Sequence, residues 1–548
     1  MIRFSSVVLS GVVAVGLLAG CGAEAPRSVD AGGSVGTPET RAALFDTIYA
    51  RTERREAFSP PKNAALGFDP LAAMMALRSK VIEAQNEEQL FYAIAEVGHA
   101  RRDRHLDLAL VPGGLQVSDS AGLDIVGQEE LPPRSAALRV YPDYSRDDPA
   151  YFVGDVATAS GTESGSEADI DVELPPIGGR ILSVNGRTTA EWHTAATAFM
   201  RHSSIIGLKW KLAEAMSLAT ATFPPDLRSE VLTLEVEAPD GGSETYALPY
   251  YDAETLTWAG TGAPSYPGTA IALSTPTYDL HVPEVDARHV VLVWRGFRET
   301  MVPDVDALVE YAAEHDLLDR TLVMDVTRSR GGSLGPYAMQ RLQPRAFKTT
   351  FGNLRLSDVT LPFVEDKRTD FEAQTIEDAG VREIIDDGTW LMEWLEEDVI
   401  PALERGDAYS SNVPFKSAHA PRDSDGILEP TPVHFRGPIV LISGPHGGSH
   451  LDQFASIIKD NELGAIVGMP PGGYSNTWEW DQVLTMPGMG RPLLSFMWTI
   501  GHSIRPNGEI LEGNPIEVDE WVPLTPDNVT NYYGILLERA LAAVEARR

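Results

Sequence analysis

Residues 438–460 read Pro-Ile-Val-Leu-Ile-Ser-Gly-Pro-His-Gly-Gly-Ser-His-Leu-Asp-Gln-Phe-Ala-Ser-Ile-Ile-Lys-Asp. The apolar run from Pro438 to Ser443 predicts a buried strand, and Ser449 to Asp460 predicts a helix. The glycine turn between them brings Ser449 to the first turn of that helix, where free backbone N–H groups and the helix dipole can hold an oxyanion. Ser449 is therefore a candidate nucleophile. Ser449-x-x-Asp452 is also an acceptable capping box, a far more common role for such a serine.

The residues around this stretch alternate between apolar strands and helices. We expect strands at His289–Trp294, Thr321–Val326 and Ala465–Gly468, with helices at Asp304–His315 and near Tyr337–Leu342. Such alternation implies right-handed parallel crossovers. The sequence therefore predicts a layered α/β domain over residues 286–548.

The preceding part of the chain divides into two further segments. Residues 115–285 lack a long helical repeat and predict a β-rich domain, in which a strand ends at the tight-turn pair Asn185-Gly186. This stretch, with the later Val231–Glu237 strand, resembles the core of a PDZ domain. Residues 40–114 have a helical pattern up to about Gly98, followed by an extended stretch.

The N-terminus has the features of an export signal. Residues 1–20 contain Arg3 and an apolar run that is short for a membrane span, and they end in Leu-Ala-Gly before Cys21. This ending resembles a bacterial lipobox, which implies lipidation of Cys21 and a flexible tether over residues 21–39. Gly22 favours the outer membrane, facing the periplasm or the cell surface. The alternative is an ordinary signal peptide with an incidental cysteine.

Charge and cysteine content exclude several classes of protein. The chain has 548 residues, with 44 Lys and Arg against 79 Asp and Glu, for a formal net charge of −35. So acidic a protein repels nucleic acid, because binding phosphates requires clustered basic residues. The one cysteine can form neither an intrachain disulfide nor a cysteine zinc cage. No oligomeric state is predicted.

A second glycine turn carries a family resemblance. Residues 322–333 read Leu-Val-Met-Asp-Val-Thr-Arg-Ser-Arg-Gly-Gly-Ser, a strand entering Gly331-Gly332. Together with the Ser449 turn and the strand ending at Gly468, this stretch resembles the tail-specific (C-terminal processing) serine proteases. The resemblance covers roughly residues 80–112 and 175–525. It implies a crotonase/ClpP-like ββα core and an oxyanion hole made by the N–H of Gly331 or Gly332 with that of His450.

One departure from the family's pattern identifies the branch. The bacterial enzymes use a lysine base after the strand that ends at Gly468, but this chain has Tyr474 there and no lysine between Asp460 and Arg491. A phenol is a poor base at neutral pH. The tricorn-like branch uses a histidine after an N-terminal helix, and the matching residue is His105. His99 and His446 are competitors, and a solvated surface histidine is the non-functional alternative.

The third member of the implied triad is a carboxylate near the C-terminus. In the stretch Gly-Glu-Ile-Leu-Glu-Gly-Asn-Pro-Ile-Glu-Val-Asp (508–519), Glu512 is the candidate and Glu509 the reserve. The pattern is degraded, so a solvated surface carboxylate is the alternative. His446 and His450 stand four apart, but the glycines between them break a helical ligand face. No metal or organic cofactor is implied.

These observations predict a lipid-anchored serine endopeptidase of the bacterial cell envelope. Ser449, His105 and Glu512 would hydrolyse polypeptide substrates, namely exported or envelope proteins. The rival is a non-catalytic ligand- or peptide-binding lipoprotein on the same scaffold, which an occluded Ser449 would favour. A crotonase-like acyl-CoA enzyme fits poorly, because an exported lipoprotein would not meet CoA thioesters.

Overall fold

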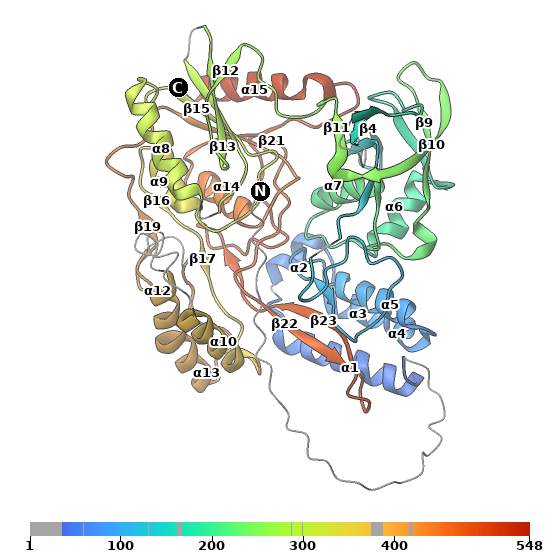
Figure 1. Ribbon diagram of the computed structural model, residues 1–548. Coiled ribbons are helices and arrows are strands. Elements are labelled where there is room, and N and C mark those ends of the chain that lie inside the picture. The colour runs from blue at the N-terminus through green and yellow to red at the C-terminus, as the bar shows by residue number, and fades with distance from the viewer. Residues whose placement is uncertain are drawn as a thin grey trace, which may run out of the picture.

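The computed structural model describes residues 35–547 except 59, 130, 162–166, 286–287, 299, 374–386 and 416–419. The predicted signal segment 1–20, Cys21 and most of the tether 21–39 lie outside the described residues. Figure 1 shows an α/β region, a β-rich region and a group of N-terminal helices against the strands β22 and β23. None of the helices within the described ranges is long and apolar enough to cross a membrane.

The α/β region contains a seven-stranded sheet of order β12-β13-β14-β15-β20-β21-β25. The pairs β14–β15, β15–β20, β20–β21 and β21–β25 are parallel, as the alternating pattern predicts. The α/β fold class is confirmed. The strands are β12 (Thr269–Ser274), β13 (Tyr278–Pro283), β14 (His289–Trp294), β15 (Thr321–Asp325), β20 (Ile439–Ser443), β21 (Gly464–Gly468) and β25 (Glu520–Trp521).

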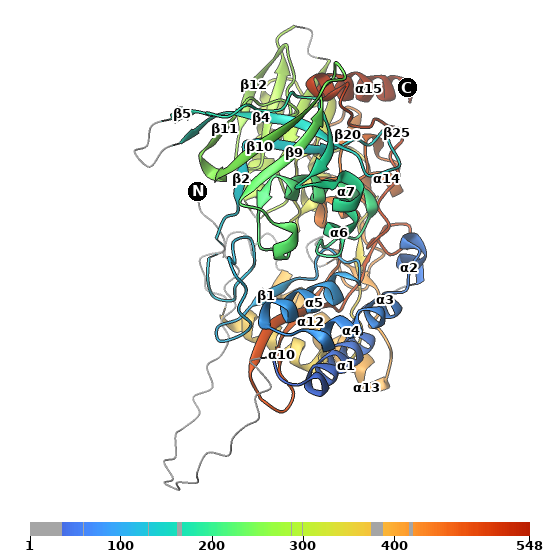
Figure 2. The same ribbon diagram turned by 90° about the vertical axis from the view of Figure 1, so that its right-hand side faces the viewer.

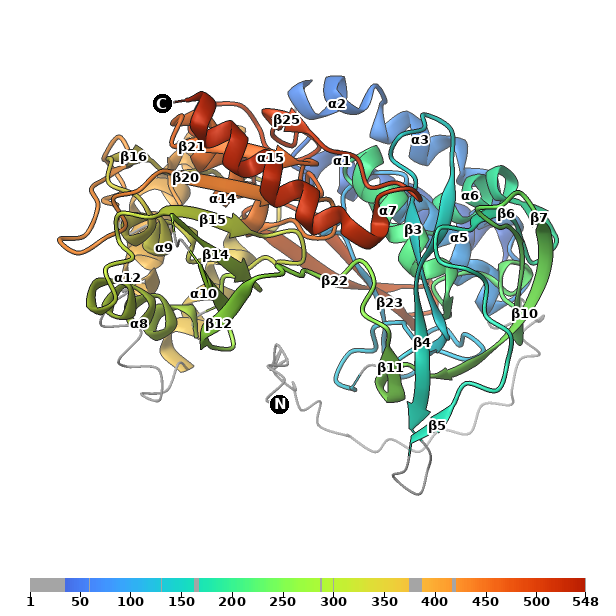
Figure 3. The same ribbon diagram turned by 90° about the horizontal axis from the view of Figure 1, so that it is seen from above.

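Alternate residues of the central strands pack on opposite faces of this sheet. Val291 and Val323 face α15 (Tyr532–Ala546), whereas Leu292 and Met324 face the helices of the other layer. That other layer contains α8 (Met301–Glu314), α9 (Gly335–Leu342) and α14 (His450–Asp460). Figure 3 shows α15 lying across β20 and β21. Both faces are covered, which is why these strands are apolar throughout.

The β-rich region forms a ten-stranded sheet whose main order is β11-β4-β6-β9-β10-β2-β8. Asn185 and Gly186 both have positive φ, +49° and +77°, at the turn that joins β6 to β7. The predicted tight turn is therefore confirmed, while the PDZ-like assignment stays a prediction. The elements are β2 (Arg134–Ala136), β3 (Leu138–Pro142), β4 (Tyr151–Gly161), β5 (Glu167–Asp169), β6 (Arg180–Val184), β7 (Arg187–Thr188), α6 (Thr189–Thr197), α7 (Ile205–Met216), β8 (Leu218–Ala219), β9 (Val231–Glu237), β10 (Ser243–Asp252) and β11 (Leu256–Trp258).

The N-terminal helices pack against a three-stranded sheet from the C-terminal half. Strand β1 (Leu108–Leu110) pairs antiparallel with β23 (Pro492–Thr499), which pairs with β22 (Glu479–Thr485). Figure 2 shows this group beneath the β-rich region. The helices are α1 (Pro38–Arg55), α2 (Pro60–Leu66), α3 (Pro70–Ala76), α4 (Arg78–Glu83) and α5 (Glu87–His99). Pairing of β1 with β23 brings the loop after α5 to the C-terminal half.

A helical insertion follows the short strands β16 (Phe347–Lys348) and β17 (Phe351–Gly352). Its helices pack through Trp394, which stacks on Trp478 with ring centroids 5.6 Å apart. The described helices of the insertion are α10 (Thr360–Ala373), α12 (Asp387–Trp394), a π-helical turn (Leu395–Val399) and α13 (Ile400–Arg405). Short strands β18 (Val413–Pro414), β19 (Ile427–Leu428) and β24 (Ser503–Ile504) complete the chain.

Candidate active site

Ser449 occupies a strained position between β20 and α14. Its φ and ψ are +60° and −123°, a region that a residue with a side chain seldom adopts. The Ser449 N–H donates a 2.6 Å hydrogen bond to the carbonyl of Tyr474. Such strain costs on the order of 1–3 kcal/mol, persists only where surrounding contacts enforce it, and is concentrated at functional sites.

The side chain of Ser449 does not cap α14, so the capping-box interpretation is wrong. The Ser449 Oγ instead lies 3.2 Å from His105 Nε2. The Asp452 carboxylate, the expected partner in the box, accepts the N–H groups of Gly473 (3.1 Å) and Tyr474 (3.2 Å). The backbone conformation of Ser449 explains the difference, because an N-cap residue ordinarily has extended φ and ψ.

His105 lies in the loop between α5 and β1, which the β1–β23 pairing holds against the C-terminal half. Its backbone N–H donates to Asp103 Oδ1 at 3.0 Å. Burial lowers the pKa of the imidazole to about 4, although the Asp103 carboxylate opposes the shift. His105 is therefore neutral at neutral pH, as a general base must be.

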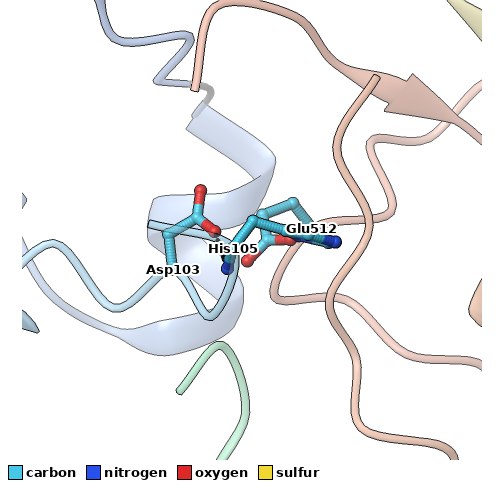
Figure 4. A group of neighbouring side chains, drawn as sticks. All are labelled: Asp103, His105 and Glu512. Atoms are coloured by element: carbon cyan, nitrogen blue, oxygen red, sulfur yellow. Dashed lines mark hydrogen bonds between the residues drawn. The ribbon is translucent and has the colours of Figure 1, made fainter. Parts of the chain in front are cut away.

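Glu512 and Asp103 lie beside the imidazole (Figure 4). Asp103, His105 and Glu512 each place one carboxylate oxygen or ring nitrogen within 4.8 Å of the corresponding atoms of the other two. Within the described residues, neither Glu512 Oε1 nor His105 Nδ1 has a hydrogen-bond partner, and both atoms are buried. Glu509, the reserve candidate, is exposed and bonds to Asn507 and Asn514 instead.

Lys62 was not predicted from the sequence, and its buried ammonium lies beside both carboxylates. Its Nζ is 3.5 Å from Asp103 Oδ2 and 4.0 Å from Glu512 Oε1. Burial lowers the pKa of Lys62, but the neighbouring carboxylates outweigh it and raise that pKa overall. Asp103, His105 and Glu512 are also a set of residue types that could ligate a metal, but here Lys62 supplies the positive charge.

Two of the predicted oxyanion donors, Gly331 and His450, lie next to Ser449. Gly331 lies so close that a Cβ there would be 2.7 Å from Ser449 Cβ. His450 is the first residue of α14, and its imidazole Nε2 accepts the N–H of Gly335. Among the described residues, the backbone N–H groups of Gly331, Gly332 and His450 donate to no protein acceptor. Backbone N–H groups of this kind are suited to hold an oxyanion.

Tyr474 stands where the bacterial relatives of the predicted family have a lysine, and it packs on the catalytic histidine candidate. The ring centroid of Tyr474 is 5.1 Å from that of His105. The Arg104 guanidinium carbon lies over the same tyrosine ring, 4.9 Å from its centroid. Burial raises the pKa of the Tyr474 phenol, so it is protonated at neutral pH. Tyr474 therefore cannot serve as the base, and its carbonyl instead fixes Ser449.

The competing histidines bind other partners. His446 Nδ1 lies 3.0 Å from Glu214 Oε1, and Trp210 donates to the same nitrogen at 3.2 Å. His99 is half-buried at the end of α5, and burial lowers its pKa to about 3. The geometry therefore favours His105 over both as the base for Ser449.

Comparison with solved structures finds the same fold in mature CPAF. Mature CPAF gives a TM-score of 0.66 at 13% identity, over 93% of this chain and 98% of that one. Mature CPAF complexed with lactacystin gives 0.67 at 13% identity, over 93% and 99%. The photosystem II D1 C-terminal processing protease is 12% identical over 89% and 94%, with a TM-score of 0.38.

No protein-family model matches the sequence, and no curated protein matches it. At 13% identity the likeness to CPAF is a likeness of fold. It extends over nearly the whole of both chains, so the β-rich region and the N-terminal helices belong to the shared architecture. The chain therefore has the fold of mature CPAF.

Proposed function

We propose that this protein is a serine endopeptidase that hydrolyses polypeptides through Ser449, His105 and Glu512. The observation that carries the proposal is the 3.2 Å contact between Ser449 Oγ and His105 Nε2. A serine hydroxyl becomes a useful nucleophile only beside a base, and His105 is neutral at neutral pH. The shared fold with CPAF and the unpaired N–H groups beside Ser449 support the same reading.

The proposed reaction proceeds in two steps. Ser449 Oγ attacks the peptide carbonyl carbon while His105 Nε2 takes the hydroxyl proton, and the N–H groups of Gly331 and His450 stabilise the oxyanion. The imidazolium, held by Glu512, then gives its proton to the leaving amine as the C–N bond breaks. Water attacks the acyl-enzyme, again losing a proton to His105, and the carboxylic acid leaves as Ser449 regains its proton.

The rival binding-protein function is favoured by an occluded serine. Ser449 is partly exposed, which favours the peptidase over this rival.

We further propose an envelope location, with Cys21 as the lipid anchor and exported or envelope proteins as substrates. This part rests on the sequence of residues 1–22.

Labelling with a fluorophosphonate tests the proposed function. The wild-type protein should be labelled at Ser449, and Ser449→Ala should not be labelled. His105→Ala should lower peptide turnover by roughly 100- to 10,000-fold and suppress labelling, because the hydroxyl loses its base. His446→Ala is the control and should retain labelling, because its imidazole bonds Glu214. A folded wild type that neither labels nor cleaves peptides would contradict the proposal.

A further inference from the structure

Lys62 and the two carboxylates beside His105 form a buried cluster with more negative than positive charge. The side chains of Lys62, Asp103 and Glu512 are only 3%, 0% and 1% exposed. Glu56 also faces Lys62, but it is paired with Arg101 at 3.1 Å. His502 and His105 also lie near Lys62, and His502 Nε2 bonds the carbonyl of Ala57. Glu479 faces Asp103, and burial with the Asp103 charge raises the pKa of Glu479 to about 7. One ammonium therefore serves two carboxylates.

The two carboxylates are not equally supported. Asp103 Oδ2 accepts from Asn476 Nδ2 and Thr499 Oγ1, both at 2.7 Å, and Oδ1 accepts the His105 N–H. Glu512 Oε2 accepts the N–H of Ser475 at 2.8 Å, whereas Oε1 has no hydrogen bond within the described residues. Hydrogen bonds to a carboxylate favour its ionised form. If the cluster lacked its cation, the proton would therefore bind to Glu512.

Glu512 lies within 4.8 Å of the imidazole, so its protonation state favours one or the other imidazole tautomer. An ionised Glu512 can only accept, so the proton of neutral His105 lies on Nδ1 and Nε2 is free to accept from Ser449. A protonated Glu512 would donate to Nδ1 and leave the imidazole proton on Nε2. That tautomer cannot take a proton from the serine hydroxyl.

We infer that Lys62 is a positioning residue that keeps Glu512 ionised and thereby holds His105 in the tautomer that accepts the Ser449 proton. The inference rests on the proposed function. Helix α2 positions the ammonium: a Cβ at Gly513 would be 3.3 Å from Lys62 Cγ, so the lysine stem packs directly beside the residue that follows Glu512. Burial, and after it Asp103, raise the pKa of Glu512 well above its ordinary value, and Lys62 is the charge that opposes them and favours the ionised form.

The pH dependence of kcat/KM tests this role. In Lys62→Met, the acid limb of the profile, where kcat/KM rises with pH, should move at least one pH unit higher, because Glu512 then keeps its proton to a higher pH. The loss should be mainly in kcat, with a smaller change in KM. Lys62→Arg should keep the wild-type limb. The double variant Lys62→Met with Asp103→Asn removes one charge of each sign, and its limb should return toward the wild-type position. Lys80→Met, which removes a lysine that is 54% exposed, is the control.

A spectroscopic measurement separates this inference from the proposed activity. In protein labelled with ¹⁵N-histidine, the His105 shifts should indicate the Nδ1–H tautomer at pH 7 in wild type and the Nε2–H tautomer in Lys62→Met. This result does not depend on turnover, so an inactive wild type would contradict only the proposed function. An unchanged tautomer and limb in folded Lys62→Met would overturn the role of Lys62. The role of Lys62 would also be overturned if Lys62→Met lost the same fraction of activity at every pH and that loss matched its loss of thermal stability.

Discussion

At the scale of single residues, the site depends on a strained serine and on a histidine whose charge is suppressed by burial. Burial lowers the pKa of His105 to about 4. The imidazole is thus neutral throughout the range in which a peptidase is normally assayed. An acid limb observed well above pH 4 then reports another group: Glu512, whose pKa burial and Asp103 raise, or Asp452, whose pKa burial raises to about 8.

Asp103→Asn should therefore move the acid limb of kcat/KM to lower pH. Removing the Asp103 charge removes a repulsion that raises the pKa of Glu512, so Glu512 ionises at lower pH. The substitution also removes the Asp103 charge that raises the pKa of His105, so the pKa of His105 falls as well. Initial rates across pH 4–9 measure this, and a limb that moves upward would contradict it.

Adjacent glycines should respond differently to a methyl group. Gly331→Ala would place Cβ 2.7 Å from Ser449 Cβ, so we expect labelling and kcat to fall roughly 100-fold or more with modest change in thermal stability. Gly332→Ala would place Cβ 2.0 Å from the Phe297 carbonyl oxygen, in a backbone with φ +154°. Its main effect should be a lower melting temperature. Equal losses of activity and stability in both variants would argue against an oxyanion role for Gly331.

At the scale of elements, the turn that carries Tyr474 fixes the nucleophile. Helix α14 supports this turn through Asp452, and the Tyr474 carbonyl in turn accepts the Ser449 N–H. The side chain expected to cap the helix thus supports a neighbouring loop instead. The loop then holds Ser449 in its positive-φ conformation.

Asp452→Ala should lower both stability and activity. It leaves the buried N–H groups of Gly473 and Tyr474 without acceptors, at about 1–3 kcal/mol for each unsatisfied group. Asp452→Asn keeps an acceptor oxygen, and burial already raises the pKa of Asp452 to about 8, so it should be milder. Urea unfolding and labelling rates distinguish the two. Full activity in Asp452→Ala would show that the turn does not position Ser449.

At the scale of the whole molecule, a membrane anchor on an acidic body should be visible in fractionation. If Cys21 is lipidated, wild-type protein should sediment with membranes despite its net charge of −35. Cys21→Ala should remain unprocessed or lack an acyl chain, as mass spectrometry of the N-terminal peptide will show. Wild-type protein found wholly in the soluble periplasmic fraction, with no acyl mass, would contradict the prediction.

The sequence predicted those parts of the fold and site that local patterns determine. Strands β14, β15 and β20 and the serine turn follow from apolar runs and glycines, and their positions are confirmed. The core sheet nevertheless includes β12 and β13, which precede the expected boundary at residue 286. The sequence of β12 and β13 resembles that of the β-rich region before them, so composition did not assign these two strands to the α/β domain.

Long-range partners account for what the sequence left out. Lys62 stands 41 residues before Asp103 and far from Glu512 in the chain, and its own segment indicates only a short helix. Asn476 and Thr499, which fix Asp103, are likewise ordinary polar residues in their local context. The capping box failed for the same reason, because the Tyr474 carbonyl imposes the Ser449 conformation from 25 residues away.

The pairing of β1 with β23 also determines when the proposed triad can assemble. His105 reaches Ser449 from a loop next to β1, and β1 pairs with a strand that begins at Pro492. Glu512 comes later still. A chain that emerges from the ribosome N-terminus first therefore lacks the proposed triad until Glu512 has appeared. Under the proposed function, this order of appearance delays hydrolysis of neighbouring proteins by an unfinished copy.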